Sequence, residues 1–183
     1  MDNMTDALIC VDIFDRPIGT CSKQKAHEEG LLHRAFSVFL ADPVRRRMLI
    51  HQRAAHKYHS GELWTNTCCS HPREGEGTEK AARRRLLEET GIDCLVEELF
   101  SFVYRQVYEN GITEYEVDHV FLGFYDSGKA DWETDPEEIQ AMEWIGLDQL
   151  ADSLLKEPER YSAWFLIAAP KVLQHLDNLI KGE

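Results

Sequence analysis

Long apolar runs are missing from this chain of 183 residues. Nowhere do about 18 apolar residues follow one another, so the sequence predicts no transmembrane helix and no membrane partner. The N-terminus lacks the basic-then-apolar order of a signal peptide, because Asp2, Asp6 and Asp12 interrupt it. We therefore expect a cytoplasmic protein.

Regularly spaced cysteines are also missing. The five cysteines are an odd number without regular spacing, which argues against a disulfide framework and for a reducing compartment. Cys68 and Cys69 are adjacent in the chain. A strained disulfide between them is one alternative, and two free thiols are the reading that we favour.

Positive charge is also in short supply. The net charge is −13, which disfavours non-specific binding to nucleic acid. Residues 1–90 are nearly balanced, with 14 Lys and Arg against 13 Asp and Glu, whereas residues 91–183 hold 6 against 20. An acidic protein with local basic clusters suits a small anionic ligand better than a polyanion.

Apolar alternation and short apolar runs predict strands, and helical spacing predicts helices. The expected strands are 7–14, 36–40, 48–50, 95–104, 116–125 and 141–145. The expected helices are 78–90, 148–155 and 162–180, with 22–30 as a loop or short helix. Thr78 is expected as the N-cap of the first long helix and Gly91 as its end.

These elements predict an α+β fold, an α/β/α sandwich with a mixed, mainly antiparallel sheet flanked by helices. Residues 15–19 are expected to form a turn, and Asn110-Gly111 to reverse the chain between two long strands. At this length one domain, residues 1–183, accounts for the whole chain.

Groups that carry chemistry gather between residues 65 and 91. Cys69 is a candidate proton donor and acceptor, and its alternative is a small buried apolar side chain. Arg84–Glu88 and Arg85–Glu89 have i,i+4 spacing, which is typical of a solvated helix with ion pairs. The alternative is that the glutamates bind a divalent ion beside a phosphate.

Five further residues are candidate metal ligands. Glu114 and Glu116 lie two apart in a predicted strand, which puts both carboxylates on one face. Imidazole is the commonest ligand of transition metals, so His27, His33 and His71 would complete an N/O site for Mn²⁺, Zn²⁺ or Mg²⁺. Five unrelated polar residues are the alternative, and spacing alone favours it.

Three cations could serve an anionic ligand. Lys23, Arg53 and Lys57 would bind a diphosphate, or they are ordinary surface charges.

A resemblance adds to this reading. The segment from Ser70 to Ile92 resembles the Nudix box, G-x5-E-x7-R-E-U-x-E-E-x-G-U with U aliphatic. It departs from the pattern at Ser70, which replaces the first Gly, and at Arg85, which replaces the first box glutamate. Since hydrolysing members use that carboxylate to hold Mg²⁺, the resemblance argues against diphosphate hydrolysis.

Further segments are similar to the type I isopentenyl-diphosphate isomerases, a family with the Nudix fold. The matching segments run in order along nearly the whole chain. They are Lys23-x3-His27, 32–37, 64–72, Tyr104-Arg105, 114–116 and 162–164.

The resemblance implies a role for each matching residue. The metal ligands would be His27, His33, His71, Glu114 and Glu116. Cys69 would transfer one proton and Glu116, assisted by Tyr104, the other, while Cys68 would have no catalytic role. Glu89 would help to bind a Mg²⁺ that accompanies the substrate diphosphate, and Trp164 would cover the hydrocarbon end.

The implied reaction is the reversible 1,3-allylic shift between isopentenyl diphosphate and dimethylallyl diphosphate. The expected partner is this small diphosphate, and the protein is expected as a monomer or weak homodimer. Two alternatives remain: a Nudix pyrophosphohydrolase acting on a nucleotide or related diphosphate, and a non-enzymatic module whose histidines and glutamates hold a structural metal.

Overall fold

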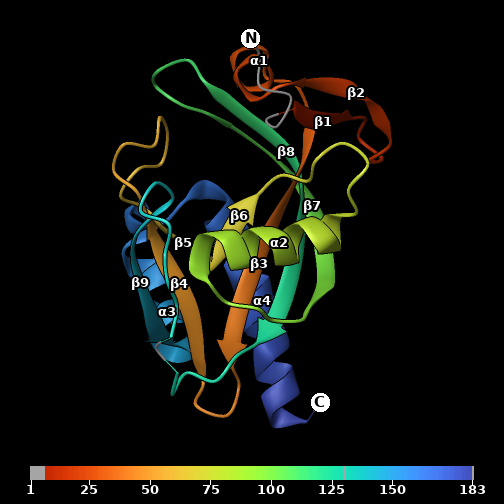
Figure 1. Cartoon of the computed structure of the whole chain (residues 1–183). Helices are drawn as coiled ribbons and strands as arrows, with labels where there is room; N and C mark the ends of the chain where they lie inside the picture. The colour runs from red at the N-terminus through yellow and green to blue at the C-terminus, as the bar shows by residue number, and fades with distance from the viewer. Residues whose placement is uncertain (1–6, 130, 183) are drawn as a thin grey trace.

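The structure, a computed structural model, describes residues 7–129 and 131–182 (Figure 1). In this part of the chain nine strands form one sheet, with four α-helices around it. The strands are β1 (Ala7–Val11), β2 (Pro17–Ser22), β3 (His33–Asp42), β4 (Arg47–Arg53), β5 (Trp64–Thr65), β6 (Cys68–Ser70), β7 (Val96–Val107), β8 (Thr113–Phe124) and β9 (Ile139–Gly146). The helices are α1 (Lys23–Glu29), α2 (Thr78–Thr90), α3 (Leu147–Lys156) and α4 (Ala163–Lys181).

Strand β3 is the centre of the sheet. It runs parallel to β8 along nearly its whole length, from the pair His33–Glu116 to the pair Ala41–Phe124. A strand has only two edges, so β1, β6 and β4, which pair antiparallel with β3, lie along the other edge. The remaining strand pairs are antiparallel too. The predicted mixed, mainly antiparallel sheet is confirmed.

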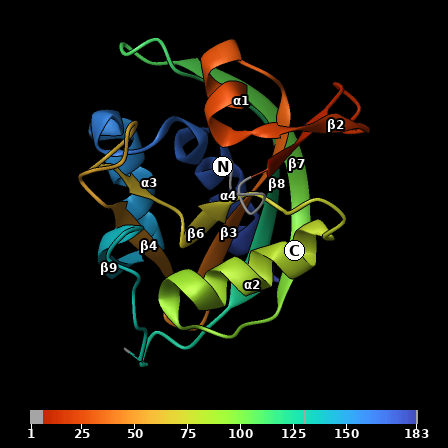
Figure 2. The same cartoon turned by 45° about the horizontal axis from the view of Figure 1, so that its top comes forward.

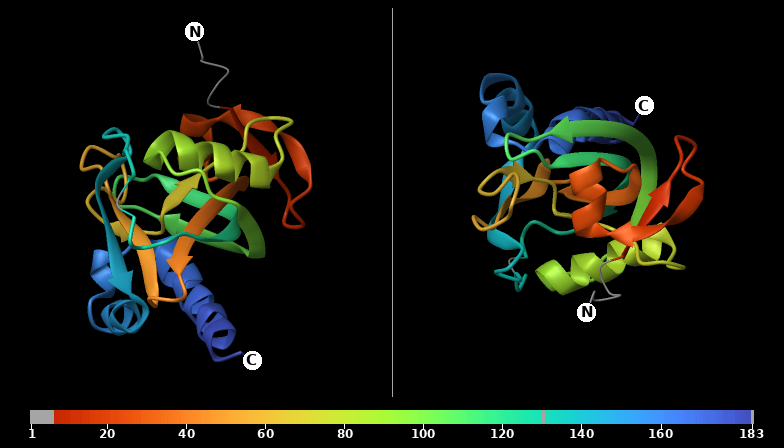
Figure 3. Two further views of the ribbon diagram at one scale, coloured as in Figure 1. Left: turned by 60° about the horizontal axis from the view of Figure 1, so that its bottom comes forward. Right: turned by 90° about the horizontal axis from the view of Figure 1, so that it is seen from above.

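Different helices cover the two faces of the sheet (Figures 1 and 3). Alternate residues of a strand point to opposite faces. Phe36 and Val38 of β3 therefore pack with Leu86 of α2, whereas Phe39 packs on the other face with Phe165 of α4. The predicted α+β class, with helices on both sides of the sheet, is confirmed.

Helix α1 lies at one end of the sheet (Figure 2), where it contacts β8, β1 and β2. The Ser22 hydroxyl accepts a hydrogen bond of 3.3 Å from the Lys25 N–H and caps the helix. Gly30 ends it in the left-handed conformation, with φ of 63°. Of the two alternatives for residues 22–30, the short helix is correct, and it carries His27 into the interior.

Several predicted boundaries differ from the structure. Thr78 is the first residue of α2 and not its N-cap, because the Gly77 carbonyl accepts the hydrogen bond from Ala81 that opens the helix. The predicted end at Gly91 is confirmed. The strand expected over 7–14 stops at Val11, since the Asp12 carboxylate accepts the backbone N–H groups of residues 14 and 16 and bends the chain.

Two other features concern the chain as a whole. Across residues 7–129 and 131–182 no helix is both long and apolar enough to cross a bilayer. The single domain over residues 1–183 stays a prediction, and its residues 1–6, 130 and 183 lie outside the described residues.

Candidate active site

Most of the predicted site residues meet at one cavity. Its volume is about 360 Å³, within the range of small-molecule sites. Nine of the predicted residues line it, namely Lys23, Arg53, Lys57, Cys69, His71, Tyr104, Glu114, Glu116 and Trp164. The other three, His27, His33 and Glu89, are buried.

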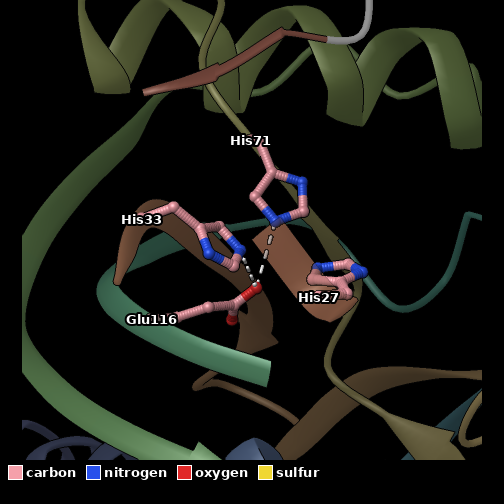
Figure 4. Close-up of side chains that lie close together, drawn as sticks. All are labelled: His27, His33, His71 and Glu116. Carbon is pink, nitrogen blue, oxygen red and sulfur yellow. Dashed lines mark hydrogen bonds and ion pairs between the residues drawn. The ribbon is translucent and has the colours of Figure 1, made fainter. Parts of the chain in front are cut away.

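Four side chains form a compact cluster (Figure 4): His27, His33, His71 and Glu116. Each offers one ligand atom, and these atoms all lie within 4.8 Å of one another. The parallel register of β3 and β8 pairs His33 with Glu116, while α1 supplies His27 and the segment after β6 supplies His71. Glu116 Oε1 lies 3.0 Å from His71 Nε2 and 3.3 Å from His33 Nε2.

The outer nitrogens of two of these rings are already engaged. His33 Nδ1 lies 2.8 Å from the Leu31 carbonyl oxygen, and His27 Nδ1 lies 2.5 Å from the Tyr58 hydroxyl. Such contacts orient metal-binding imidazoles in proteins. Among the described residues, the Nε2 atoms of His27 and His33 are buried without a hydrogen-bond partner.

The charge states of His27, His71 and Glu116 suit a cation, whereas Glu116 raises the pKa of His33 against the opposing effect of burial. Burial lowers the pKa of His27 to about 3 and that of His71 to about 4, so both rings are neutral and keep a lone pair. Burial opposes ionisation of Glu116, but the neighbouring imidazoles of His33 and His71 outweigh it and hold its pKa well below the usual range. Three imidazoles and one carboxylate therefore fit a divalent metal ion.

Glu114 takes a different position from the other predicted ligands. It lies outside the four-residue cluster, although it is two residues from Glu116 on the same strand. Its carboxylate contacts Tyr104, Tyr108 and His59. Its role as a metal ligand stays a prediction.

The two adjacent cysteines face opposite sides of the sheet. Cys68 is fully buried beneath α2, whereas Cys69 lines the cavity and packs on the α4 side. Cys69 pairs with Ser37 of β3, so it lies along the edge of β3 opposite to Glu116. Burial raises the pKa of the Cys69 thiol to about 12, against an opposing effect of Arg53, whose Nη1 is 3.8 Å from Sγ. At neutral pH the sulfur carries its proton.

Tyr104 connects directly to Glu116. The antiparallel register of β7 and β8 pairs Tyr104 with Glu116, and the Tyr104 hydroxyl donates to Glu116 Oε2 over 2.6 Å. Burial and the nearby carboxylates raise the pKa of Tyr104 well above its usual range, so the phenol is protonated.

Trp164 forms an aromatic wall of the cavity. Its indole N–H donates to Asn66 Oδ1 over 3.1 Å, and Asn66 Nδ2 donates to the Cys68 carbonyl over 2.6 Å. These bonds fix α4 against the strand that carries Cys69. The Arg53 guanidinium carbon lies 5.2 Å from the centre of the indole ring.

The predicted cations line the cavity together with one that was not predicted, Arg85. Arg85 Nη2 lies 2.5 Å from Glu89 Oε1 and 3.5 Å from Glu138 Oε1. Lys57 also pairs with Glu138, at 2.6 Å. Glu89 is 2% exposed, and burial raises its pKa to about 7. It does not line the cavity, so its role beside a Mg²⁺ stays a prediction.

The prediction from the sequence missed three aromatic neighbours of the site: Tyr58, His59 and Tyr108. The crowding of His56, Lys57, Tyr58 and His59 before Gly61 was a visible signal, but nothing in their spacing ties them to residue 114.

Comparison with known proteins identifies the family. The sequence profile of the NUDIX domain matches residues 31–165. Isopentenyl-diphosphate Delta-isomerase 2 of Aromatoleum aromaticum is 45% identical over 170 residues, covering 93% of this chain and 88% of that protein. Isopentenyl-diphosphate Delta-isomerase of Serratia proteamaculans is 45% identical over 163 residues, and the alignment covers 89% of each chain.

Solved structures agree on the fold. DR0079 from Deinococcus radiodurans aligns with a TM-score of 0.72 at 19% identity, covering 90% of this chain and 98% of that one. The profile match and the near full-length relatives together show that this chain belongs to the NUDIX family and, within it, to the isopentenyl-diphosphate Delta-isomerases.

Proposed function

We propose that this protein catalyses the reversible conversion of isopentenyl diphosphate to dimethylallyl diphosphate. The observation that carries the proposal is the pairing of a protonated thiol, Cys69, with the ionised carboxylate of Glu116 at opposite edges of β3, both lining one cavity. The relatives' names support the same substrate.

The reaction requires the enzyme to donate one proton to the substrate and to remove another from it. A proton adds to the terminal methylene, which leaves a tertiary carbocation, and loss of a proton from C2 restores a double bond. The free protein has one group of each kind, since the thiol of Cys69 holds a proton and the carboxylate of Glu116 accepts one. Tyr104, bonded to Glu116, can pass a proton between that carboxylate and the substrate.

The intermediate cation needs a dry, electron-rich wall. The buried indole of Trp164 supplies one, because cation–π attraction contributes about 1–2 kcal/mol when desolvated. Lys23, Arg53 and Lys57, joined by Arg85, would bind the two phosphates, and Glu89 would help to bind the Mg²⁺ that accompanies them. A Mn²⁺, Zn²⁺ or Mg²⁺ ion held by His27, His33, His71 and Glu116 would favour the ionised form of the carboxylate.

Arg85 also weighs against the alternative of diphosphate hydrolysis. It occupies the position where hydrolysing Nudix proteins carry a carboxylate for Mg²⁺, and its positive charge opposes a metal ion there.

The test is incubation of the metal-loaded protein with isopentenyl diphosphate in D₂O, with separation of the products and measurement of released phosphate. We expect dimethylallyl diphosphate carrying deuterium, and no phosphate above the no-enzyme control. Phosphate release without deuterium incorporation would replace the isomerase with a hydrolase. Metal binding without either product would leave a structural metal module. The cytoplasmic location and the monomeric or weakly dimeric state stay predictions.

A further inference from the structure

Three side chains hold the carboxylate of Glu114. Its Oε2 accepts a hydrogen bond of 2.7 Å from the Tyr108 hydroxyl and a longer one of 3.2 Å from the Tyr104 hydroxyl. Its Oε1 lies 3.2 Å from His59 Nε2. Glu114 is 5% exposed, so these three groups replace the water that an exposed carboxylate would bind.

The two partners that were not predicted also support each other. The rings of His59 and Tyr108 are stacked, with centroids 4.9 Å apart and an interplanar angle of 30°. The Ser60 hydroxyl lies 3.4 Å from His59 Nδ1 and donates to the Tyr108 hydroxyl over 3.2 Å. His59, Ser60, Tyr108 and Glu114 therefore form a closed ring of contacts, which we call the Glu114 clamp.

The clamp joins two segments that are far apart in the sequence. His59 and Ser60 lie in the loop between β4 and β5, and Tyr108 lies at the turn between β7 and β8. Asn110 Nδ2 in the same turn donates to the Tyr58 carbonyl over 2.9 Å, which ties the two segments together a second time. The Tyr58 hydroxyl in turn reaches His27 of the metal cluster.

A free glutamate side chain has several rotamers and loses them when it binds a metal. A carboxylate that is already fixed beside the four-residue cluster has fewer rotamers left to lose. In other metalloproteins, removing a side chain that orients a metal ligand lowers the metal affinity by roughly 10–100-fold.

We propose that His59 and Tyr108 are positioning residues that hold Glu114 ready as a fifth ligand beside His27, His33, His71 and Glu116. The proposal rests on the proposed function in one respect, the assumption that the cluster binds a divalent ion. It assigns no direct contact with the metal or the substrate to His59 or Tyr108.

The main experiment measures Mn²⁺ affinity of the full chain by competition with a chelator, without substrate. Tyr108→Phe removes the shortest bond to Glu114, and we expect the Mn²⁺ Kd to rise about 10-fold. Tyr125→Phe is the matched control, because its hydroxyl also donates to a carboxylate, Asp131, over 2.8 Å, but outside the cavity. An unchanged or lower Kd in Tyr108→Phe would overturn the proposal.

A pair of variants separates positioning from ligation. His59→Ala deletes the contact to Glu114, and we expect a loss of affinity similar to that of Tyr108→Phe. His59→Gln keeps an N–H donor and should restore affinity to within about three-fold of the wild type. Equal losses in both variants would make His59 itself a ligand and contradict a positioning role.

Thermal unfolding of each metal-free variant checks that the fold is intact. If the wild type binds Mn²⁺ without isomerising isopentenyl diphosphate, the proposed function fails while these affinity differences still test the clamp. If the wild type isomerises and the variants bind Mn²⁺ as it does, the clamp fails alone.

Discussion

At the scale of single residues, Cys68 and Cys69 are neighbours in the chain, but their thiols lie in different environments. Strand geometry turns Cys68 toward α2 and Cys69 toward the cavity, because neighbouring residues of β6 face opposite sides. We predict that Cys69→Ala abolishes isomerisation, whereas Cys68→Ala retains most of it and lowers the free energy of unfolding by about 1 kcal/mol. Product analysis and denaturant unfolding measure these effects. Comparable loss of activity in both variants would show that the wrong thiol has been assigned.

The carboxylate on the other side, Glu116, gives a second prediction. Glu116→Gln keeps the shape of the side chain but removes its proton acceptor, so we expect no turnover even with saturating metal. Tyr104→Phe removes the hydroxyl that donates to Glu116 and should lower kcat by about 100-fold with a smaller change in KM. Steady-state kinetics on folded protein checks both. Retained turnover in Glu116→Gln would reassign this proton transfer to another residue.

Some residues of the site could be predicted from the sequence and others could not. Residues in motifs with matching order, such as Cys69, His71 and Glu116, were predicted and line the cavity. His59 and Tyr108 were missed because their contact with Glu114 depends on the path of an irregular loop, which no periodicity describes. Local patterns carry no information about which distant segments a loop will reach.

At the scale of elements, α2 is attached to the loop before it by a bidentate ion pair. Arg84 Nε and Nη2 each donate to Glu76 over 2.8 Å, and this bonding lowers the pKa of Glu76 to about 2. A carboxyl group whose folded pKa is depressed stabilises the fold above its ordinary pKa and loses this contribution as pH falls through the folded pKa.

We predict that Glu76→Gln lowers the free energy of unfolding by roughly 1–2 kcal/mol at pH 7, a value reduced for the partial exposure of both side chains. The difference from the wild type should shrink between pH 4.5 and about 2, where Glu76 becomes protonated in the wild type as well. Urea unfolding across this range measures it. Glu97→Gln, an exposed position on β7, is the control. A pH-independent difference would contradict the ion-pair explanation.

Element types followed from the sequence better than element ends. The periodic segments of α2, α3 and α4 and the long strands β7 and β8 were recognised. β5 and β6 were not, since two or three residues are too few to show alternation. β2 was read as a turn and a loop, because most of its residues are exposed and it has no buried face to produce a pattern.

At the scale of the whole molecule, the metal cluster brings together side chains from four parts of the chain. α1, β3, β8 and the segment after β6 each contribute one ligand. Without a cation, two buried imidazole nitrogens lack partners among the described residues, which costs free energy in the folded state. A bound ion satisfies both and cross-links the end of the sheet that carries α1.

Metal removal should therefore lower the stability of the entire fold. An ion that binds only the folded state stabilises it by about 2.7 kcal/mol at 100 times its Kd, which corresponds to roughly 5–10 °C in Tm for a chain of this size. We expect chelation to lower Tm by this amount and added Mn²⁺ or Zn²⁺ to restore it. Calorimetry with and without chelator gives the measurement.

Two histidine variants test whether this response comes from the cluster. His33→Ala removes a ligand, so its Tm should not respond to metal. His119→Ala should respond like the wild type, because His119 lies between Asp15 and Glu98, at 2.9 and 2.7 Å, outside the cluster. If the Tm of His33→Ala rises with metal as much as that of His119→Ala, the ion binds elsewhere. The three histidines would then owe their proximity to packing, and Glu116 would have to transfer its proton without a cation beside it.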